Sequence, residues 1–94
     1  MVQPEKQRST LGIYIDILES VRELGNAKPT HILYKANLSH DRLTKYLDEL
    51  VGKGLIAVKL DGDSRYYVMT PSGVQFLIEI RKAEAFVSGF GIAL

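Results

Sequence analysis

The 94-residue chain has no cysteine and only two histidines, and these absences exclude several kinds of site. Without cysteine there is no disulfide, thiolate metal site or cysteine nucleophile, which fits a cytosolic protein. His31 and His40 have no acidic or thiol cluster at ligand spacing around them, so we predict no metal site. No apolar run is long enough to cross a membrane, and residues 1–10 lack the apolar core of a signal peptide. We therefore expect a cytoplasmic protein.

An excess of charge of one sign is also missing, since twelve basic and eleven acidic side chains give a net charge of +1. This balance is weak support for nucleic-acid binding by itself, and the positions of the charges must decide. The span from Lys28 to Arg65 holds seven basic and five acidic residues, whereas residues 9–24 hold one arginine and three acids. The positive excess that phosphate binding requires therefore lies in the middle of the chain. The alternative for any single lysine is a solvated surface position.

Patterns typical of catalysis are missing as well. No serine–histidine–aspartate order, phosphate-binding loop or buried carboxylate pair stands out, so we predict that the chain is not an enzyme and needs no cofactor. Residues 61–64, Asp-Gly-Asp-Ser, resemble the start of a calcium loop, but the rest of that ligand pattern is absent. We interpret them as a turn.

The middle of the chain has the outline of a helix-turn-helix. A short helix over residues 30–36 is followed by Asn37-Leu38, where asparagine can take a left-handed conformation. Ser39 then caps a second helix over about 39–51, with Asp41 in its first turn, where a negative charge meets the helix dipole favourably. The buried side of this helix is marked by Leu43, Leu47 and Leu50, with Tyr46 beside them. A helix-turn-helix presents its second helix to a groove of DNA.

A strongly apolar helix is expected before this motif, after a flexible polar tail at residues 1–9. Ser9 or Thr10 can cap the helix, and Gly25 can end it because glycine tolerates positive φ. Its buried stripe is Tyr14, Ile17, Leu18, Val21 and Leu24, widened by Ile13 and Ile15. An apolar face of this width favours a deeply buried helix.

Two β-rich runs follow the motif at residues 55–60 and 65–69, and the Asp-Gly between them predicts a hairpin. A hairpin directly after a helix-turn-helix is a wing. Thr70-Pro71 predicts the start of a last helix, with a cap followed by proline at the first helical position. The chain thus divides into a domain over residues 10–70 and a C-terminal helix with an apolar tail over residues 71–94.

The last helix carries apolar residues at alternating spacings of three and four, which is a heptad seam. The seam is Gly73, Phe76, Ile80, Ala83, Val87, Phe90 and Leu94, and a separate apolar face holds Val74, Leu77 and Ile78. One face can pack on the domain and the other needs a partner, so we expect a homodimer. Its expected interface residues are Phe76, Ile80, Ala83, Val87 and Phe90. One alternative is that the domain itself covers both apolar faces of the last helix. The other is that the helix ends at Gly89, before the last residues of the seam.

Four segments of the chain are informative in combination. They are Tyr34-Lys35-Ala36-Asn37-Leu38-Ser39, Leu43…Tyr46-Leu47…Leu50, Gly54-Leu55-Ile56 and Tyr67-Val68-Met69-Thr70-Pro71-Ser72-Gly73. Together they resemble the archaeal winged-helix regulators, a group that includes small ten-kilodalton DNA-binding proteins of hyperthermophilic archaea. The resemblance covers roughly residues 11 to 88. It implies a winged-helix fold, binding to double-stranded DNA and dimerisation through the C-terminal helix. Those relatives can carry a long, charged coiled coil, whereas this chain ends in an apolar, glycine-interrupted tail.

Candidate DNA contacts centre on the second helix of the motif, whose N-terminal residues would approach bases and phosphates. Arg42 is the best candidate for reading guanine, because its planar fork can bond two acceptors. Ser39, His40 and Lys45 lie on the same helix. The alternative for Ser39 is a role as helix cap alone, and the alternative for His40 is a surface position with no DNA contact. The other candidates are Lys28, Thr30 and Lys35 ahead of this helix and Lys59 and Arg65 on the wing. The acidic turn at the wing tip argues against deep insertion, since it would repel phosphate.

These patterns predict an α+β, mostly helical fold, namely a winged helix-turn-helix with a C-terminal dimerisation helix. The predicted function is a homodimeric, nucleoid-associated regulator of transcription that binds double-stranded DNA, with residues 39–51 in the major groove and a wing at residues 55–69. One alternative is an architectural chromatin protein with little sequence preference, against which the near-neutral charge argues. The other is a winged-helix module for protein–protein assembly, favoured by the small charge excess and the apolar last helix.

Overall fold

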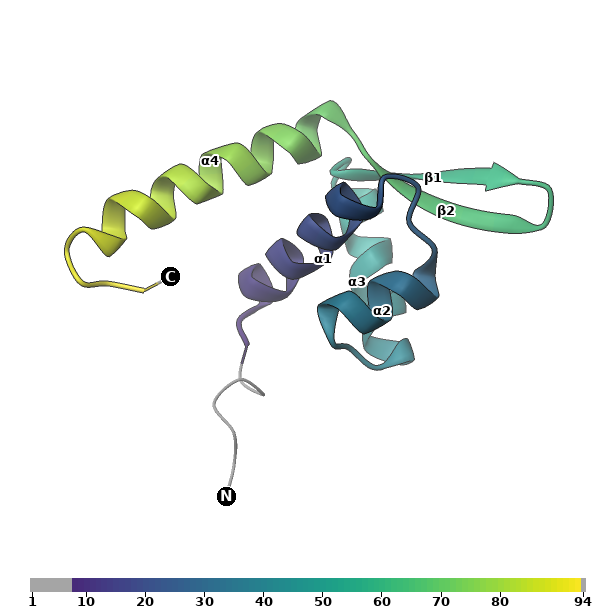
Figure 1. Ribbon diagram of the computed structural model, residues 1–94, viewed down its shortest axis with the longest axis horizontal. Helices are drawn as coiled ribbons and strands as arrows, with labels where there is room; N and C mark the ends of the chain where they lie inside the picture. The colour runs from purple at the N-terminus through teal and green to yellow at the C-terminus, as the bar shows by residue number, and fades with distance from the viewer. Residues whose placement is uncertain (1–7, 94) are drawn as a thin grey trace, which may run out of the picture.

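The computed structural model describes residues 8–93, which form four helices and a two-stranded antiparallel sheet (Figure 1). In chain order the elements are α1 (Thr10–Leu24), α2 (Pro29–Ala36), α3 (His40–Gly52), β1 (Ile56–Asp61), β2 (Ser64–Met69) and α4 (Pro71–Ser88). This is the predicted order, and the predicted winged helix-turn-helix is confirmed. Residues 1–7 of the expected tail and Leu94 of the expected seam lie outside the described residues.

The helix α1 supplies a large share of the core. Ser9 caps it, since its side-chain oxygen accepts a hydrogen bond from the Gly12 N–H at 2.9 Å. The buried residues of α1 are Ile13, Ile15, Ile17, Leu18, Ser20 and Val21, whereas Tyr14 and Leu24 of the predicted stripe are half-buried. The expected deep burial is confirmed, because α2, β2 and α4 all pack against α1.

The helix-turn-helix consists of α2, a short turn and α3. Asn37 is left-handed at a φ of 57°, as its position in the turn predicted, and Leu38 beside it is buried. Ser39 caps α3, because its Oγ accepts a hydrogen bond from the Arg42 N–H at 3.4 Å. One side of α3 is held in the core by Leu43, Tyr46, Leu47 and Leu50. The turn chemistry thus sets where α3 begins, and the leucines set which side faces inward.

The wing is the hairpin of β1 and β2, which extends away from the helices (Figure 1). Its base is bonded to the segment between α1 and α2 through Ala27. The Ala27 N–H donates to the Tyr67 carbonyl at 2.9 Å, and the Tyr67 N–H donates to the Ala27 carbonyl at 2.8 Å. This β-bridge lies just before α2, which begins at Pro29.

The start of α4 is tied to the loop before the wing by Thr70. The Thr70 Oγ1 accepts a hydrogen bond from the Gly73 N–H at 3.0 Å and donates one to the Gly54 carbonyl at 2.6 Å. Gly73 also packs closely, since a Cβ at this position would lie 2.0 Å from the Leu55 carbonyl oxygen. The first turn of α4 is therefore fixed by both a predicted cap and a close backbone contact.

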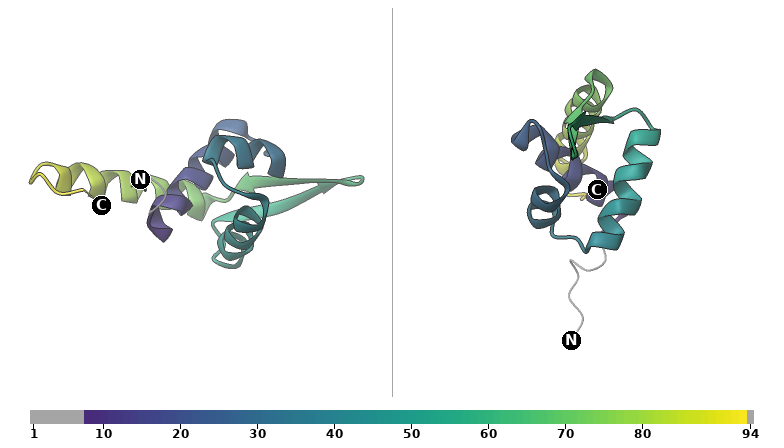
Figure 2. Two further views of the ribbon diagram at one scale, coloured as in Figure 1. Left: turned by 90° about the horizontal axis from the view of Figure 1, so that it is seen from below. Right: turned by 90° about the vertical axis from the view of Figure 1, so that its right-hand side faces the viewer.

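Beyond its first half, α4 leaves the domain on the side opposite the wing (Figures 1 and 2). Only Gly73 and Leu77 of its residues are buried. The helix ends at Ser88 with Gly89 as its cap, so Phe90 of the expected seam follows the helix rather than belonging to it. Neither α4 nor any other helix within residues 8–93 is long and apolar enough to cross a membrane.

Candidate DNA-binding surface

The side of α3 that faces away from the core is polar and exposed. Because Leu43 and Leu47 point inward, Arg42 and Lys45 are left in solvent. The other exposed residues at this end of the helix are Ser39, His40, Asp41, Thr44 and Asp48. The four residues that the sequence proposed on α3 therefore all remain accessible to a ligand.

Tyr46 orients both cations of α3. The Arg42 guanidinium carbon lies 6.0 Å and the Lys45 Nζ 5.3 Å from the centre of its ring, which are cation–π distances. The same ring meets the Tyr14 ring edge-on with centroids 6.1 Å apart. Sequence reasoning placed Tyr46 on the buried side and missed this role, although the Arg42–Tyr46 spacing of four residues was a signal for it.

A second contact joins α1 to α3 behind this surface. The Tyr14 hydroxyl donates a hydrogen bond to the Glu49 Oε1 at 2.7 Å. This bond to a carboxylate, together with partial burial, raises the pKa of Tyr14 above its ordinary value of 10.0. The interaction links α3 to α1, and it occupies an acid that would otherwise face the same solvent as Lys45.

A hollow of about 180 Å³ lies between α3, the wing and the start of α2. It is lined by Pro29, His40, Leu43, Thr44, Leu47, Asp48, Arg65 and Tyr67. The hollow brings Arg65 of the wing beside the N-terminal half of α3. Thr44 and Asp48 were not among the proposed site residues. Their positions at i+4 from His40 and Thr44 place them on the side of α3 that faces the wing.

The two wing cations lie on opposite sides of the hairpin. In the strand register Leu60 pairs with Arg65 and Lys59 pairs with Tyr66, and paired residues point to the same side of a sheet. Arg65 therefore shares the side that faces α3, whereas Lys59 shares the other side with Tyr66. Lys28 lies on that second side too, with its Nζ 5.8 Å from the centre of the Tyr66 ring. The sequence grouped Lys59 with Arg65, and the register separates them.

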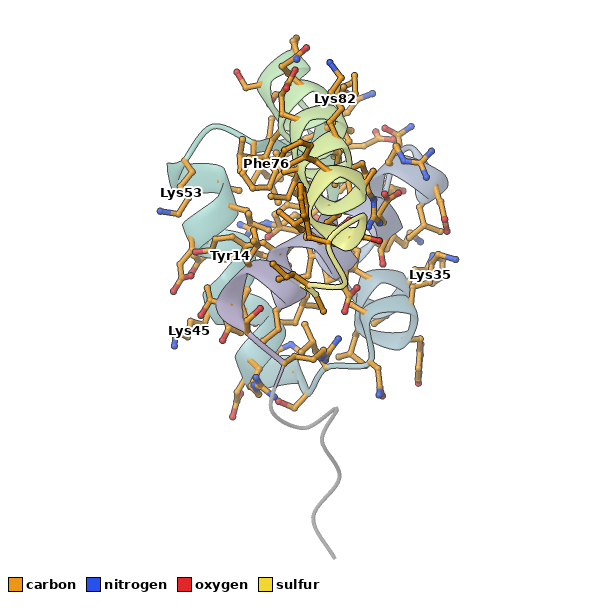
Figure 3. All side chains as sticks on the ribbon, turned by 90° about the vertical axis from the view of Figure 1, so that its left-hand side faces the viewer. Tyr14, Lys35, Lys45, Lys53, Phe76 and Lys82 are labelled. Carbon is orange, nitrogen blue, oxygen red and sulfur yellow. The ribbon has the colours of Figure 1, made fainter. Side chains whose placement is uncertain are left out.

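Lys35 lies away from this surface. Its Nζ forms an ion pair with the Glu23 Oε1 of α1 at 3.0 Å, and Figure 3 shows Lys35 and Lys45 on opposite sides of the molecule. Thr30, in the first turn of α2, is exposed beside the Pro29 that lines the hollow. Of the two candidates on α2, Thr30 is thus the one that lies near α3 and the wing.

Ion pairing divides the cations of the molecule into two groups. Arg8, Arg22, Lys35, Arg81 and Lys82 each lie within 4.0 Å of a carboxylate. Within residues 8–93 no such partner lies beside Arg42, Lys45 or Arg65. Lys28, Lys53 and Lys59 also have no carboxylate partner among the described residues. The unpaired cations thus lie on or near α3 and the wing, where phosphate oxygens can take the place of a carboxylate. The turn at the wing tip is acidic, with Asp61 and Asp63 both exposed.

The residues proposed for dimerisation differ in their surroundings. Phe76 and Ile80 are half-buried and pack against the core, and Val87 is also half-buried. Ala83 and Phe90 are exposed, and Phe90 meets the Phe86 ring edge-on at 5.5 Å. Phe86 was not among the proposed residues because it lies off the heptad seam. The first half of the seam thus packs on the domain itself, whereas Ala83 and Phe90 in its second half are exposed.

A metal centre is not apparent in the described part of the chain. Residues 8–93 contain no group of three or more histidine, aspartate or glutamate side chains placed to hold an ion. Asp61 and Asp63, which resembled a calcium loop in the sequence, instead flank the tip of the hairpin.

Known proteins share this arrangement. A model of the winged helix-turn-helix family matches residues 7–87, whereas no curated protein matches the chain. Among solved structures, Sso10a-2, a DNA-binding protein from Sulfolobus solfataricus, is similar with a TM-score of 0.77 and 26% sequence identity. That likeness covers 88% of this chain and 85% of Sso10a-2.

Two further proteins have the same fold at lower identity. The transcriptional regulator BldR from Sulfolobus solfataricus is 20% identical with a TM-score of 0.70, over 83% of this chain and 58% of its own. BpsR from Bordetella bronchiseptica, whose DNA binding is regulated by 6-hydroxynicotinic acid, is 17% identical with a TM-score of 0.73, over 92% and 63%. This chain spans less than two thirds of either regulator. By its fold and by the family match over most of its length, the chain belongs to the winged helix-turn-helix family.

Proposed function

We propose that this protein is a homodimeric regulator of transcription that binds double-stranded DNA through α3. The observation that carries the proposal is that Arg42 and Lys45 on α3 and Arg65 beside the hollow are all exposed and have no carboxylate partner within residues 8–93. Arg8, Arg22, Lys35, Arg81 and Lys82, by contrast, are already paired with carboxylates. A protein that needs phosphate partners is expected to keep cations free in this way.

Each element has a distinct role in the proposed complex. The N-terminal half of α3 enters the major groove, where Arg42 reads guanine and Lys45 contacts phosphate. Arg65 reaches the phosphates next to the major groove from the α3 side of the wing, and Lys28 and Lys59 act from its other side. The remaining polar contacts assigned to DNA are Ser39, His40 and Thr30. Lys35 is not assigned a DNA contact, because it pairs with Glu23.

The acidic tip of the wing limits how the hairpin engages DNA. Asp61 and Asp63 are exposed there, and both would repel phosphate at close approach. We therefore assign the wing contact to the sides of the hairpin rather than to insertion of its tip into the minor groove.

Dimerisation is proposed through the second half of the seam, along the end of α4 and the residues that follow it. Ala83, Val87 and Phe90 lie there, and burying an aromatic side chain stabilises by roughly 1.5–3 kcal/mol. A two-fold dimer would present two copies of α3 to a palindromic site, as in other helix-turn-helix dimers. The relatives support the DNA-binding part of the proposal, since Sso10a-2 is described as DNA-binding and BldR as a transcriptional regulator.

The test is selection of genomic fragments by the purified protein, repeated with Arg42→Ala. The wild type is expected to enrich a guanine-containing sequence, and the variant to lose preference at one base pair at a cost of about 1–3 kcal/mol. An unchanged preference would remove Arg42 from the role of base reader.

The same selection separates the two rival functions. An architectural protein would retain all fragments about equally at fixed salt. Such an absence of sequence preference would indicate that the protein packages DNA rather than regulating transcription. The exposed apolar part of α4 also favours a module for protein–protein assembly, which would retain no duplex at low salt.

A further inference from the structure

The structure assigns a positioning role to Arg8, a residue just before α1 that contacts the turn of the helix-turn-helix. Its NH1 donates to the Ala36 carbonyl at 2.9 Å, and its NH2 donates to the Asn37 carbonyl at 3.0 Å. A third bond runs from NH1 to the Asp16 Oδ2 at 2.6 Å. We infer that Arg8 holds the start of α3 in the orientation that DNA recognition requires, an inference that rests on the proposed function.

The acceptors explain why an arginine suits this position. The last carbonyls of a helix have no partner within the helix and lie at the negative end of its dipole. Ala36 ends α2, and Asn37 follows it in the left-handed conformation, so their carbonyls are two such acceptors. A planar guanidinium can donate to both at once, whereas a lysine ammonium is a single point of charge.

Asp16 completes the arrangement from α1. Its carboxylate directs the guanidinium toward the turn, and the Arg8 side chain is 25% exposed as a result. Arg8 therefore bridges α1 and the end of α2, and Ala36 lies 28 residues after Arg8 in the chain. The sequence assigned Arg8 to a flexible tail, but its three bonds belong to the folded domain.

The consequence for DNA binding follows from the chain order. The turn that Arg8 holds leads directly into Ser39, which caps α3, and then to His40 and Arg42. Recognition side chains need to be held within about half an ångström of their working geometry. A turn released from Arg8 would let the first turn of α3 shift without unfolding the core, most of which is supplied by α1 and the inward side of α3, with further residues from α2, the wing and α4.

Arg8 differs in this from a residue that contacts phosphate. Its guanidinium is shared among three protein acceptors, so it acts through the turn rather than on DNA. Loss of a phosphate contact weakens binding to all duplexes and reduces the salt dependence by about one unit of slope. Loss of a positioning residue is expected to weaken binding to the specific site and to leave the slope unchanged.

The experiment compares the full chain with its Arg8→Ala, Arg8→Lys and Asp16→Asn variants, and Arg22→Ala serves as the control. Arg22 is also on the α1 side of the molecule and is paired with Glu19, so the control removes the same charge away from the turn. Each protein is titrated with its selected duplex and with random duplex at several salt concentrations, well below its unfolding temperature. Hydrogen exchange of the Leu38 and Leu43 amides is measured without DNA.

For Arg8→Ala we expect about a tenfold loss of affinity for the selected duplex, little change for random duplex and an unchanged salt slope. Exchange at Leu38 and Leu43 should become faster. The affinity of Arg8→Lys for the selected duplex should fall between those of the wild type and Arg8→Ala, because lysine keeps the charge but lacks the planar fork. Asp16→Asn should lose less affinity for this duplex than Arg8→Ala. Arg22→Ala should match the wild type.

Three results would overturn the inference. They are an equal loss on both duplexes with a smaller salt slope, unchanged exchange at the turn, or faster exchange with full specific affinity. If the wild type binds no duplex at all, the proposed function fails, and the exchange measurement still decides whether Arg8 holds the turn.

Discussion

The helices α1 and α4 are both long and apolar, yet they use their apolar residues in different ways. Six of the 15 residues of α1 are buried, including Ile17 and Leu18 with no exposed surface. Only Gly73 and Leu77 are buried among the 18 residues of α4, and its Phe86 is 70% exposed. Apolar content alone therefore does not say whether a helix builds the core of its own chain.

The difference comes from what surrounds each helix. The helix α1 is contacted by α2, β2 and α4, so its apolar side chains are enclosed within one chain. The helix α4 contacts the domain through its first half and then continues past it (Figure 1). Substitutions in α1 should therefore act mainly on folding, whereas substitutions in the second half of α4 should act mainly on assembly.

Among substitutions that test this difference between α1 and α4, Ile17→Ala is expected to cause the largest change, a loss of folding stability. Ile17 is completely buried, and truncating such a side chain costs about 2–5 kcal/mol through lost burial and the cavity left behind. Urea unfolding should show a lower midpoint with an unchanged slope. If stability fell by less than about 0.5 kcal/mol, within the range of surface substitutions, α1 would not be the core helix described above.

The next effect is expected from Phe90→Ala, which should weaken the dimer. Phe90 is 71% exposed in one chain, and covering its ring in a partner is worth roughly 1.5–3 kcal/mol, or about ten- to a hundredfold in the dimer dissociation constant. Sedimentation equilibrium measures the change. Ile78→Ala, on the other apolar face of α4, is the matched control and should leave the dimer intact. If only the Ile78→Ala dimer dissociated, the interface would lie on the face of Ile78 and not on the seam.

The smallest effect is expected from Glu19→Gln, which removes the ion pair between α1 and α4. Glu19 accepts a hydrogen bond from the Arg81 NH2 at 2.9 Å and another from the Arg22 NH2 at 2.6 Å. Partial burial would raise the pKa of Glu19, but the hydrogen bonds and charges of Arg22 and Arg81 outweigh it and lower this pKa below 4.5. A partly exposed pair contributes at most about 1 kcal/mol.

A carboxyl with a lowered pKa stabilises the fold above its unfolded pKa, and this stability is lost as the pH falls through the folded value. The stability difference between the wild type and Glu19→Gln should therefore be full at neutral pH and shrink below about pH 4.5. Thermal unfolding across this range tests the window. Glu79→Gln leaves the α1–α4 contact in place and should show no such trend. A trend shared by both variants would mean that the loss of one negative charge, and not the loss of this ion pair, changes the stability.

Local chemistry let the sequence predict much of the fold. Asn37, Ser39 and Thr70 each act within a few residues of the chain, and each occupies the turn or cap expected of it. The proposed exposure of Arg42 and Lys45 followed from the spacing of the leucines on α3 in the same way.

Features that depend on distant parts of the chain were not predictable from these patterns. The sides of the wing occupied by Lys59 and Arg65 follow from the strand register, which an alternating pattern fixes only when one face is buried along its whole length. The pairing of Lys35 with Glu23 and the bonds of Arg8 to the turn depend on how α1 packs against α2. In each case the residue type was visible and its partner was not.

The central claim is that the position of charge, and not its amount, makes α3 the DNA-binding element. Lys45→Ala and Lys82→Ala remove the same charge from opposite parts of the molecule, as Figure 3 shows, and Lys82 is paired with Glu79 at 3.6 Å. The direct measurement is the affinity of both variants for one duplex over a range of salt concentrations. We predict that Lys45→Ala loses about tenfold in affinity and about one unit of salt slope, while Lys82→Ala matches the wild type. Equal losses in the two variants would contradict the claim.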